Sequence, residues 1–145
     1  MSITYRDADI QREIGKVLPL IQAHGLEAYG PEVNVNLASF MLLARNGQLQ
    51  TYVACEGDKI VGYSLWITSF DLMFEHHTRA DEIALYVLPE FRGRPAIKLM
   101  RYAEMRLRDS GYTRLARAAK KDSKLHSTLL GLGYGREEVI VFKEF

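Results

Sequence analysis

The stretch that decides the fold is Glu82-Ile-Ala-Leu-Tyr-Val-Leu-Pro-Glu-Phe-Arg-Gly-Arg94. Residues 81–88 carry apolar side chains on both faces, which is typical of a strand inside a sheet. Pro89–Pro95 reads as a turn, and an apolar stripe from Ala96 to Leu107 predicts a helix that ends at Gly111. We therefore expect a strand, a short turn and a helix in immediate succession.

The segments on either side complete a sheet around this unit. Residues 113–118 have a strand pattern, so the unit from 81 to 118 is a β-turn-α-β crossover with parallel strands. Upstream, residues 50–55 and 60–67 predict two strands joined by a Gly-Asp hairpin turn. Because strands that follow one another through short turns pair antiparallel, we expect a mixed sheet.

The two ends of the chain add helices and two more strands. Residues 2–6 predict a strand, and Asp7 or Asp9 can cap a helix that His24-Gly25 would end. The remaining predictions are a helix over Val33–Ala44, a helix over roughly 123–131 capped by Asp122 or Ser123, and a final strand over Val139–Phe145. The sum is an α/β fold in a single domain, residues 1–145, with a central mixed sheet of six to seven strands flanked by about four helices.

The composition of the chain argues against several classes of protein. The chain has 145 residues and a net charge of +1, so no global basic surface indicates a nucleic-acid partner. Cys55 is the single cysteine and lies in a strand-like run, which predicts a buried structural thiol and no intramolecular disulfide. No apolar run approaches the length of a membrane span and no signal-peptide core is present, so we expect a cytoplasmic protein.

The turn after residue 88 has the chemistry of a phosphate site. A loop that runs straight into a helix presents unpaired backbone N–H groups, and the helix dipole favours an anion there. Gly93 allows close approach of a ligand to the backbone. Arg92, Arg94 and Lys98 add positive charge. Taken alone, a turn of this kind is also an ordinary loop before an amphipathic helix.

The element order and the stretch Val87-Leu-Pro-Glu-Phe-Arg-Gly93 resemble the GNAT N-acyltransferase superfamily. In that family a strand ends in hydrophobic-Val-x-Pro-Glu-Tyr/Phe-Arg-Gly and a helix follows directly. Leu132-Gly133-Tyr134 resembles the Leu-Gly-Phe that follows the last helix of the family. A narrower resemblance, to phage-encoded GNAT-like acetyltransferases, is indicated by His126.

The resemblance implies acetyl-CoA as cosubstrate and no metal. It places the coenzyme A pyrophosphate at the turn and the pantetheine arm along the end of the strand. The cofactor-binding residues that it implies are Tyr86, Val87, Arg92, Gly93, Arg94, Ala96, Ile97 and Asp122. The sequence departs from the family at Pro95, which has no N–H, and at Ile97, where the family has a small residue.

Acyl transfer to an amine needs a base, and Glu82 lies where several family members carry a catalytic glutamate. The alternative is a solvated glutamate at the start of a strand. The family's usual tyrosine acid falls on Leu129 here, so Tyr134 or Tyr86 would have to substitute. His76 and His77 are adjacent in a loop, point apart and make a poor metal pair.

Two functions remain open from the sequence. The first is an acetyl-CoA-dependent N-acetyltransferase with a small-molecule or protein amine as acceptor. The alternative is a catalytically inactive GNAT-fold binding protein, or a phage virion-associated or regulatory protein, which Pro95, Ile97 and Leu129 favour. We expect no nucleic-acid or membrane partner, a monomer or homodimer, and a cytoplasmic location (the host cytoplasm for a phage protein).

Overall fold

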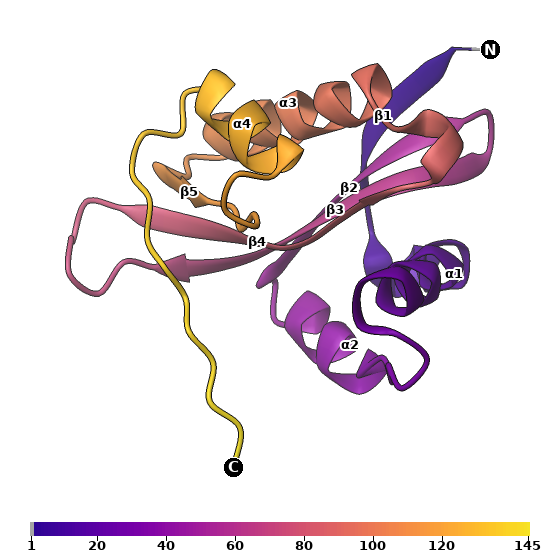
Figure 1. Ribbon diagram of the computed structural model, residues 1–145, viewed down its shortest axis with the longest axis horizontal. Coiled ribbons are helices and arrows are strands. Elements are labelled where there is room, and N and C mark those ends of the chain that lie inside the picture. Colours follow the sequence, from indigo (N-terminus) through magenta and orange to yellow (C-terminus); the bar gives the residue numbers. More distant parts are fainter. Residues whose placement is uncertain (1) are drawn as a thin grey trace.

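In a computed structural model, which describes residues 2–145, the chain forms one sheet with helices on both sides (Figure 1). The elements in chain order are β1 (Ile3–Ala8), α1 (Ile10–Tyr29), α2 (Leu37–Arg45), β2 (Leu49–Glu56), β3 (Lys59–Phe70), β4 (Thr78–Val87), the 3-10 turn η1 (Pro89–Phe91), α3 (Arg94–Asp109), β5 (Arg114–Ala116) and α4 (Lys124–Gly131).

The sheet has the order β1-β2-β3-β4-β5. The first four strands pair antiparallel and β5 pairs parallel to β4. The sequence predicts the antiparallel pairing of β2, β3 and β4 and the parallel β4–β5 pair, and makes no prediction for the partner of β1. The strand count is lower than the expected six to seven, because the described residues form five strands and Val139–Phe145 is not among them. A run of apolar residues forms a strand only where the edge of a sheet pairs with it, and Val139–Phe145 pairs with no strand among residues 2–145.

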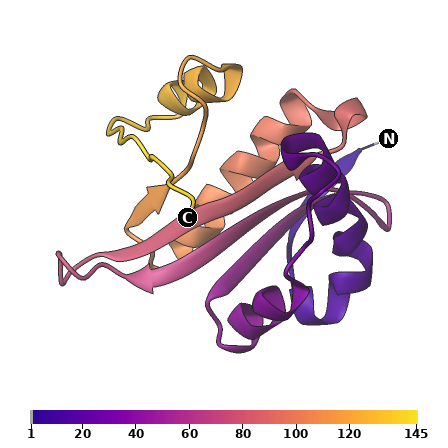
Figure 2. The same cartoon turned by 60° about the horizontal axis from the view of Figure 1, so that its bottom comes forward.

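Helices cover both faces of the sheet (Figures 1 and 2), and each face has its own core. On the side of α1 and α2, buried residues of β2, β3 and β4 pack against Val17 and Ile21 of α1. On the side of α3 and α4, Trp66 of β3 packs with Leu99 and Leu107 of α3. This two-sided burial explains why the strand that begins the deciding stretch is apolar on both faces.

The first helix is longer than predicted. Asp9 caps α1 through a 3.0 Å bond from the Gln11 amide, but the helix continues through Gly25 and ends before Gly30, whose φ is 86°. Gly25 serves packing instead of stopping the helix. A Cβ at this position would lie 2.8 Å from Cγ2 of Val33, so only glycine lets the following loop close onto α1.

Two other boundaries shift for local reasons. The second helix begins at Leu37 and not at Val33, because Asn36 caps it by accepting a 3.1 Å hydrogen bond from the Ser39 amide. Of the two candidate caps for the last helix, Ser123 serves and Asp122 does not; the Ser123 hydroxyl accepts a bond from the His126 amide. Among residues 2–145, no helix is long and apolar enough to cross a membrane.

Candidate functional site

The turn from β4 into α3 presents three unused backbone donors. Gly93 has a φ of 96° and a ψ of −126°, a conformation that favours glycine, and this sharp turn starts α3 at Arg94. Within residues 2–145, no acceptor bonds the amides of Gly93, Arg94 and Ala96. Three free N–H groups at the positive end of a 16-residue helix can cradle an anion.

Two neighbouring positions contribute no donor. Pro95 has no N–H, as the sequence shows, and its carbonyl accepts a 3.1 Å bond from the Tyr5 hydroxyl. Ile97 was predicted to bind the cofactor, but its backbone amide is not free to bond a phosphate. This amide donates the first helical bond, 3.1 Å long, to the Gly93 carbonyl. The turn therefore offers fewer free amides to a phosphate than the sequence predicts.

The Arg92 side chain does not lie over these amides. Its Nε donates to the Val87 carbonyl at 2.9 Å, and its Nη2 bonds Glu27 of α1 at 2.7 Å. The guanidinium also lies 5.4 Å from the ring centroid of Tyr86. Arg92 thus ties the end of β4 to α1 in this structure, while Arg94 and Lys98 stay exposed.

β4 and β5 pair over a short stretch only, and we call the unpaired outward edge of β4 beyond that stretch, from Glu82 to Val87, the crevice. The two strands pair at only three positions, the last being Asp81 with Ala116, and the β3–β4 register shifts at the next residues. Beyond this point, no strand among residues 2–145 pairs with the outward side of β4. Backbone groups there are free to bond a ligand that lies along the strand.

The register decides which β4 residues offer those groups. The Leu88 amide bonds the Val61 carbonyl, so alternate β4 residues bond β3, and Tyr86 opposite Tyr63 is one of them. The backbone of Leu85 and Val87 faces the crevice instead. The sequence predicts that the backbone of Tyr86 binds the cofactor, but that backbone is bonded to β3. Leu85 takes its place, and a prediction of the β3–β4 register would have identified it.

Glu82 lies at the closed end of the crevice, one residue past the last β4–β5 pair. Its Oε2 accepts 2.6 Å bonds from the Ser64 hydroxyl and from Nη1 of Arg117, and its side chain is 6% exposed. Oε1 has no hydrogen-bond partner among residues 2–145. Burial raises the pKa of Glu82 above its ordinary value of 4.5, although Arg117 opposes this rise. The solvated glutamate of the alternative interpretation is not what the structure shows.

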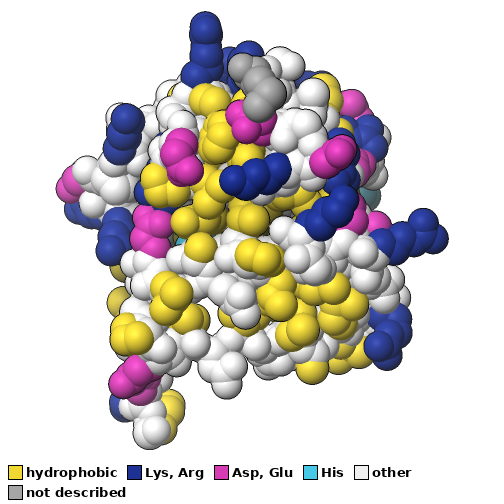
Figure 3. Space-filling model, turned by 90° about the vertical axis from the view of Figure 1, so that its right-hand side faces the viewer, with side chains coloured by type: hydrophobic (Ala, Val, Ile, Leu, Met, Phe, Trp, Pro, Cys, Tyr) yellow, Lys and Arg dark blue, Asp and Glu magenta, His cyan; other side chains and the backbone are white. Residues whose placement is uncertain are grey.

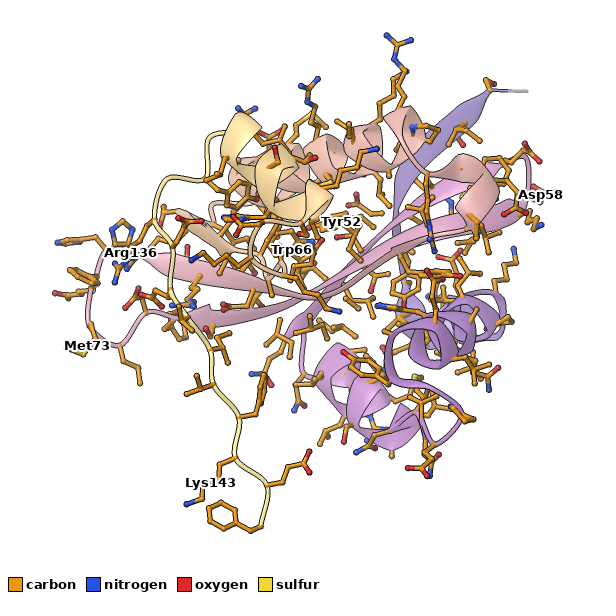
Figure 4. The ribbon with its side chains drawn as sticks, in the orientation of Figure 1. Tyr52, Asp58, Trp66, Met73, Arg136 and Lys143 are labelled. Atoms are coloured by element: carbon orange, nitrogen blue, oxygen red, sulfur yellow. The ribbon has the colours of Figure 1, made fainter. Side chains whose placement is uncertain are left out.

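Arg117 organises the closed end and was missed from sequence. Its side chain is 1% exposed, bonds the Met100 carbonyl at 3.0 Å and lies 4.7 Å from the ring centroid of Trp66. Trp66 lies on the α3 side of the sheet (Figure 4). The signal available was one arginine near the end of the strand predicted over residues 113–118, which is ordinary at a surface. Only the fold shows that this arginine points inward.

Tyr134 belongs to the same network. Its hydroxyl accepts a 2.8 Å bond from Nε of Arg117 and donates a 2.9 Å bond to Glu104. Burial raises the pKa of Tyr134 to about 12. Glu82, predicted as the base, and Tyr134, predicted as a substitute acid, are therefore brought together through one arginine.

A second cluster lies on the opposite face of β4. Nδ1 of His24 is 2.7 Å from the Tyr63 hydroxyl, and its ring stacks on Tyr86 at 5.2 Å. Burial lowers the pKa of His24, so the imidazole is neutral at pH 7. The sequence suggested His24 only as part of a helix stop.

The remaining predicted positions lie at the edges of this arrangement. Asp122 is exposed, has a φ of 61° and donates its amide to Nδ1 of His126. Leu129, at the family's tyrosine position, is a buried residue of α4. Within the described part of the chain, no group of three His, Cys, Asp or Glu side chains could hold a metal ion.

Comparison with known proteins finds one family model and a set of solved structures that this chain resembles. Residues 20–130 match the family model described as the acetyltransferase (GNAT) family. No curated protein matches the sequence significantly.

Solved structures of acetyltransferases share the fold over their whole length. An aminoglycoside acetyltransferase from an uncultured soil metagenomic sample, in complex with sisomicin, is 15% identical with a TM-score of 0.77, covering 99% of this chain and 95% of that one. The aminoglycoside acetyltransferase AAC(6')-Iy, bound to a coenzyme A bisubstrate analogue, is 14% identical with a TM-score of 0.72, over 100% and 99%. A ribosomal-protein-alanine N-acetyltransferase of Brucella melitensis biovar Abortus 2308 is 12% identical with a TM-score of 0.76, over 100% and 99%. At these identities the likeness shows the fold alone.

Proposed function

Because this chain belongs to the acetyltransferase (GNAT) family, we propose that it transfers an acetyl group from acetyl-CoA to an amine. The members of this family are described as acetyltransferases, which supports an N-acetyltransferase here. The proposal adds the donor, the place where it binds and the residues that act on it. The observation that carries it is the set of free amides at Gly93, Arg94 and Ala96, at the mouth of a crevice that ends at Glu82.

The donor site fits a diphosphate followed by an extended amide-bearing arm. The free amides and the exposed Arg94 and Lys98 supply donors and positive charge for the diphosphate. The outward backbone of Leu85 and Val87 offers strand-like bonds to the arm. Arg92 would leave the Val87 carbonyl when that bond is made, and its charge is then available to the phosphates.

Glu82 acts as the base in this proposal. An amine attacks a thioester only as the neutral species, so its proton must pass to a group near the closed end of the crevice. The partner-free Oε1 can receive that proton through a water molecule, while Oε2 stays fixed by Arg117 and Ser64. The raised pKa of Glu82 makes it a better proton acceptor than a surface glutamate.

Arg117 and Tyr134 position this base. Arg117 holds Glu82 in place and itself is held by the Tyr134 hydroxyl and the Met100 carbonyl. A phenol with a pKa of about 12 is a weak proton donor to a thiolate, so we assign Tyr134 the positioning role. The coenzyme A thiolate leaves without an acid in this scheme, as its low basicity allows.

The proposal is tested by release of free coenzyme A thiol with a panel of amines that includes an aminoglycoside, a polyamine and peptides with free N-termini. We expect thiol release with at least one amine and little with acetyl-CoA alone. Thermal denaturation gives a reading independent of the acceptor. Acetyl-CoA at about 100 times its dissociation constant should add about 2.7 kcal/mol to the free energy of unfolding.

The same two measurements separate the enzyme from the inactive binding protein. A thermal shift without turnover on any amine would favour a binding role. No shift at millimolar acetyl-CoA would overturn the donor site itself. Thiol release that persists in Glu82→Gln would remove Glu82 from its role and leave the donor site standing.

A further inference from the structure

The indole of Trp66 lies directly beside the proposed base. The β3–β4 register pairs Trp66 with Glu82, and Ser64 lies two residues earlier on the same face of β3, because side chains alternate along a strand. Trp66 packs on the α3 side of the sheet (Figure 4). Three polar side chains from two neighbouring strands therefore meet at the closed end of the crevice.

These groups are buried, unlike most charged side chains. On the face of the molecule that Figure 3 shows, Lys, Arg, Asp and Glu side chains stand out at the surface. The side chains of Glu82 and Arg117 are only 6% and 1% exposed, and Trp66 and Ser64 have no exposed surface. Because buried polar atoms must be hydrogen-bonded, the direction of each bond in this cluster follows from which atoms can donate.

The N–H of Trp66 decides which way the Ser64 hydroxyl points. An indole N–H can only donate, and this one donates to Oγ of Ser64 at 2.7 Å. The single proton of the hydroxyl then goes to Oε2 of Glu82, at 2.6 Å. Trp66 thus fixes Ser64 as a donor, and a donor to a carboxylate favours its ionised form.

The ring of the same indole holds the second donor to Glu82. The guanidinium of Arg117 lies 4.7 Å from the Trp66 ring centroid, and its Nη1 donates to the same Oε2 at 2.6 Å. A cation over an aromatic face is attracted most strongly where water is excluded. A tryptophan that only filled the core could place its N–H on a backbone carbonyl and would need no arginine over its ring.

We propose that Trp66 is a positioning residue for the base: its N–H commits the Ser64 proton to Glu82, and its ring holds the arginine that supplies the second bond. The inference rests on the proposed role of Glu82 as the base. It adds that β3 sets the charge and orientation of that base from behind, and that Oε1 is left as the oxygen open to a proton.

The titration of Glu82 tests this without any acceptor. Carbon NMR of protein labelled at the glutamate carboxyl carbon follows it, and the resonance is identified by its loss in Glu82→Gln. Ser64→Ala removes one donor, so the midpoint should move to higher pH by about 1 pH unit. Trp66→Phe keeps a ring under Arg117 and removes the N–H, so the midpoint should move upward by less.

The double variant separates positioning from general packing. If the indole acts through the hydroxyl, Ser64→Ala/Trp66→Phe should move the midpoint no further than Ser64→Ala. The other groups that face Glu82, which are Arg117, Glu104 of α3 and Tyr134, are the same in all these variants. Tyr52→Phe, at another buried aromatic residue of the same core, is the control and should leave the midpoint unchanged. An unmoved midpoint in Trp66→Phe, additive shifts, or an equal shift in Tyr52→Phe would overturn the inference.

The wild type supplies a second test that needs no stable variant. Trp66 is the only tryptophan, so its indole N–H gives a single resonance in a ¹⁵N spectrum. That resonance should shift with pH at the same midpoint as Glu82, and a resonance that stays still would overturn the inference. These readings are separate from turnover: the expected order of midpoints without thiol release on any amine would sink the proposed function alone, and thiol release with unmoved midpoints would sink this inference alone.

Discussion

The two ends of the crevice beside β4 are built in opposite ways. At the closed end, Glu82, Arg117 and Tyr134 form a buried network of side chains in which the arginine is 1% exposed. At the open end, the site consists of backbone, the amides of Gly93, Arg94 and Ala96, to which no acceptor of residues 2–145 is bonded. The side chains at the closed end hydrogen-bond one another, whereas the amides at the open end can be bonded by a ligand.

This difference separates two kinds of consequence. A change at the closed end disturbs a low-dielectric network, so it should alter turnover and folding stability. A change at the open end alters how many donors meet an anion, so it should alter affinity and leave the fold intact. Each prediction below tests whether the two ends can be perturbed independently, beginning with the largest effect.

Glu82→Gln should lower kcat about 100- to 10,000-fold, the usual range for loss of a general base. Because the base works ionised and burial raises the pKa of Glu82, wild-type kcat should rise with pH through a value above 4.5, and the variant should lack this limb. Steady-state thiol release across pH measures both. The control is Glu90→Gln, at an exposed glutamate of η1. If kcat of Glu82→Gln still rose with pH over the same range as in the wild type, another residue would be the base.

Arg117→Met should lower the free energy of unfolding by about 3–5 kcal/mol, because it leaves the Glu82 carboxylate buried and unpaired. Denaturant unfolding measures the loss. Arg108→Met, at an exposed arginine of α3, is the matched control and should cost little. The double variant Glu82→Gln/Arg117→Met should cost less than the sum of the two single changes. Strict additivity would mean that the ion pair carries no coupling.

Pro95→Ala should tighten coenzyme A binding about tenfold or more, because it restores one N–H to the cradle and a bond to a charged group contributes about 1.5–3 kcal/mol. Isothermal titration calorimetry measures the dissociation constant. Pro31→Ala, in an exposed loop, should leave affinity unchanged. Equal affinity of wild type and Pro95→Ala would place the phosphates away from the first turn of α3.

Glu27→Gln should tighten coenzyme A binding by no more than about fivefold, the range for an exposed ion pair. The substitution frees Arg92 from its bond to α1, so less is lost when the guanidinium leaves the Val87 carbonyl. The same titration measures it, with Glu32→Gln as the exposed control. Weaker binding in Glu27→Gln would show that the Glu27–Arg92 pair shapes the site and does not compete with the ligand.

The sequence predicted the frame of the molecule well because the frame follows local patterns. Strand β4, the turn and α3 are visible in the alternation of residues 81–88, in Gly93 and in the stripe after it. The hairpin and the parallel β4–β5 pair follow from connection lengths. The family resemblance, the α/β class and the enzyme class are confirmed by the family match and the fold.

What the sequence missed depends on long-range packing. Arg117 has no local signal, because its burial comes from Trp66, Met100 and Tyr134 closing around it. The amide of Ile97 is not free because the helix begins early enough for it to bond the Gly93 carbonyl, a boundary that the sequence pattern does not locate to the residue. The final strand was predicted from composition, but a strand also needs a free edge that its chain can reach. The phosphate, pantetheine and acceptor roles stay predictions.

The central claim is that the amides of Gly93, Arg94 and Ala96 bind the coenzyme A diphosphate. Amide NMR of the ¹⁵N-labelled protein during titration with coenzyme A tests it directly. The claim predicts that these three resonances shift together and saturate, with a smaller change at Ile97, whose N–H is already bonded. Saturation of binding with these three amides unmoved would contradict the claim.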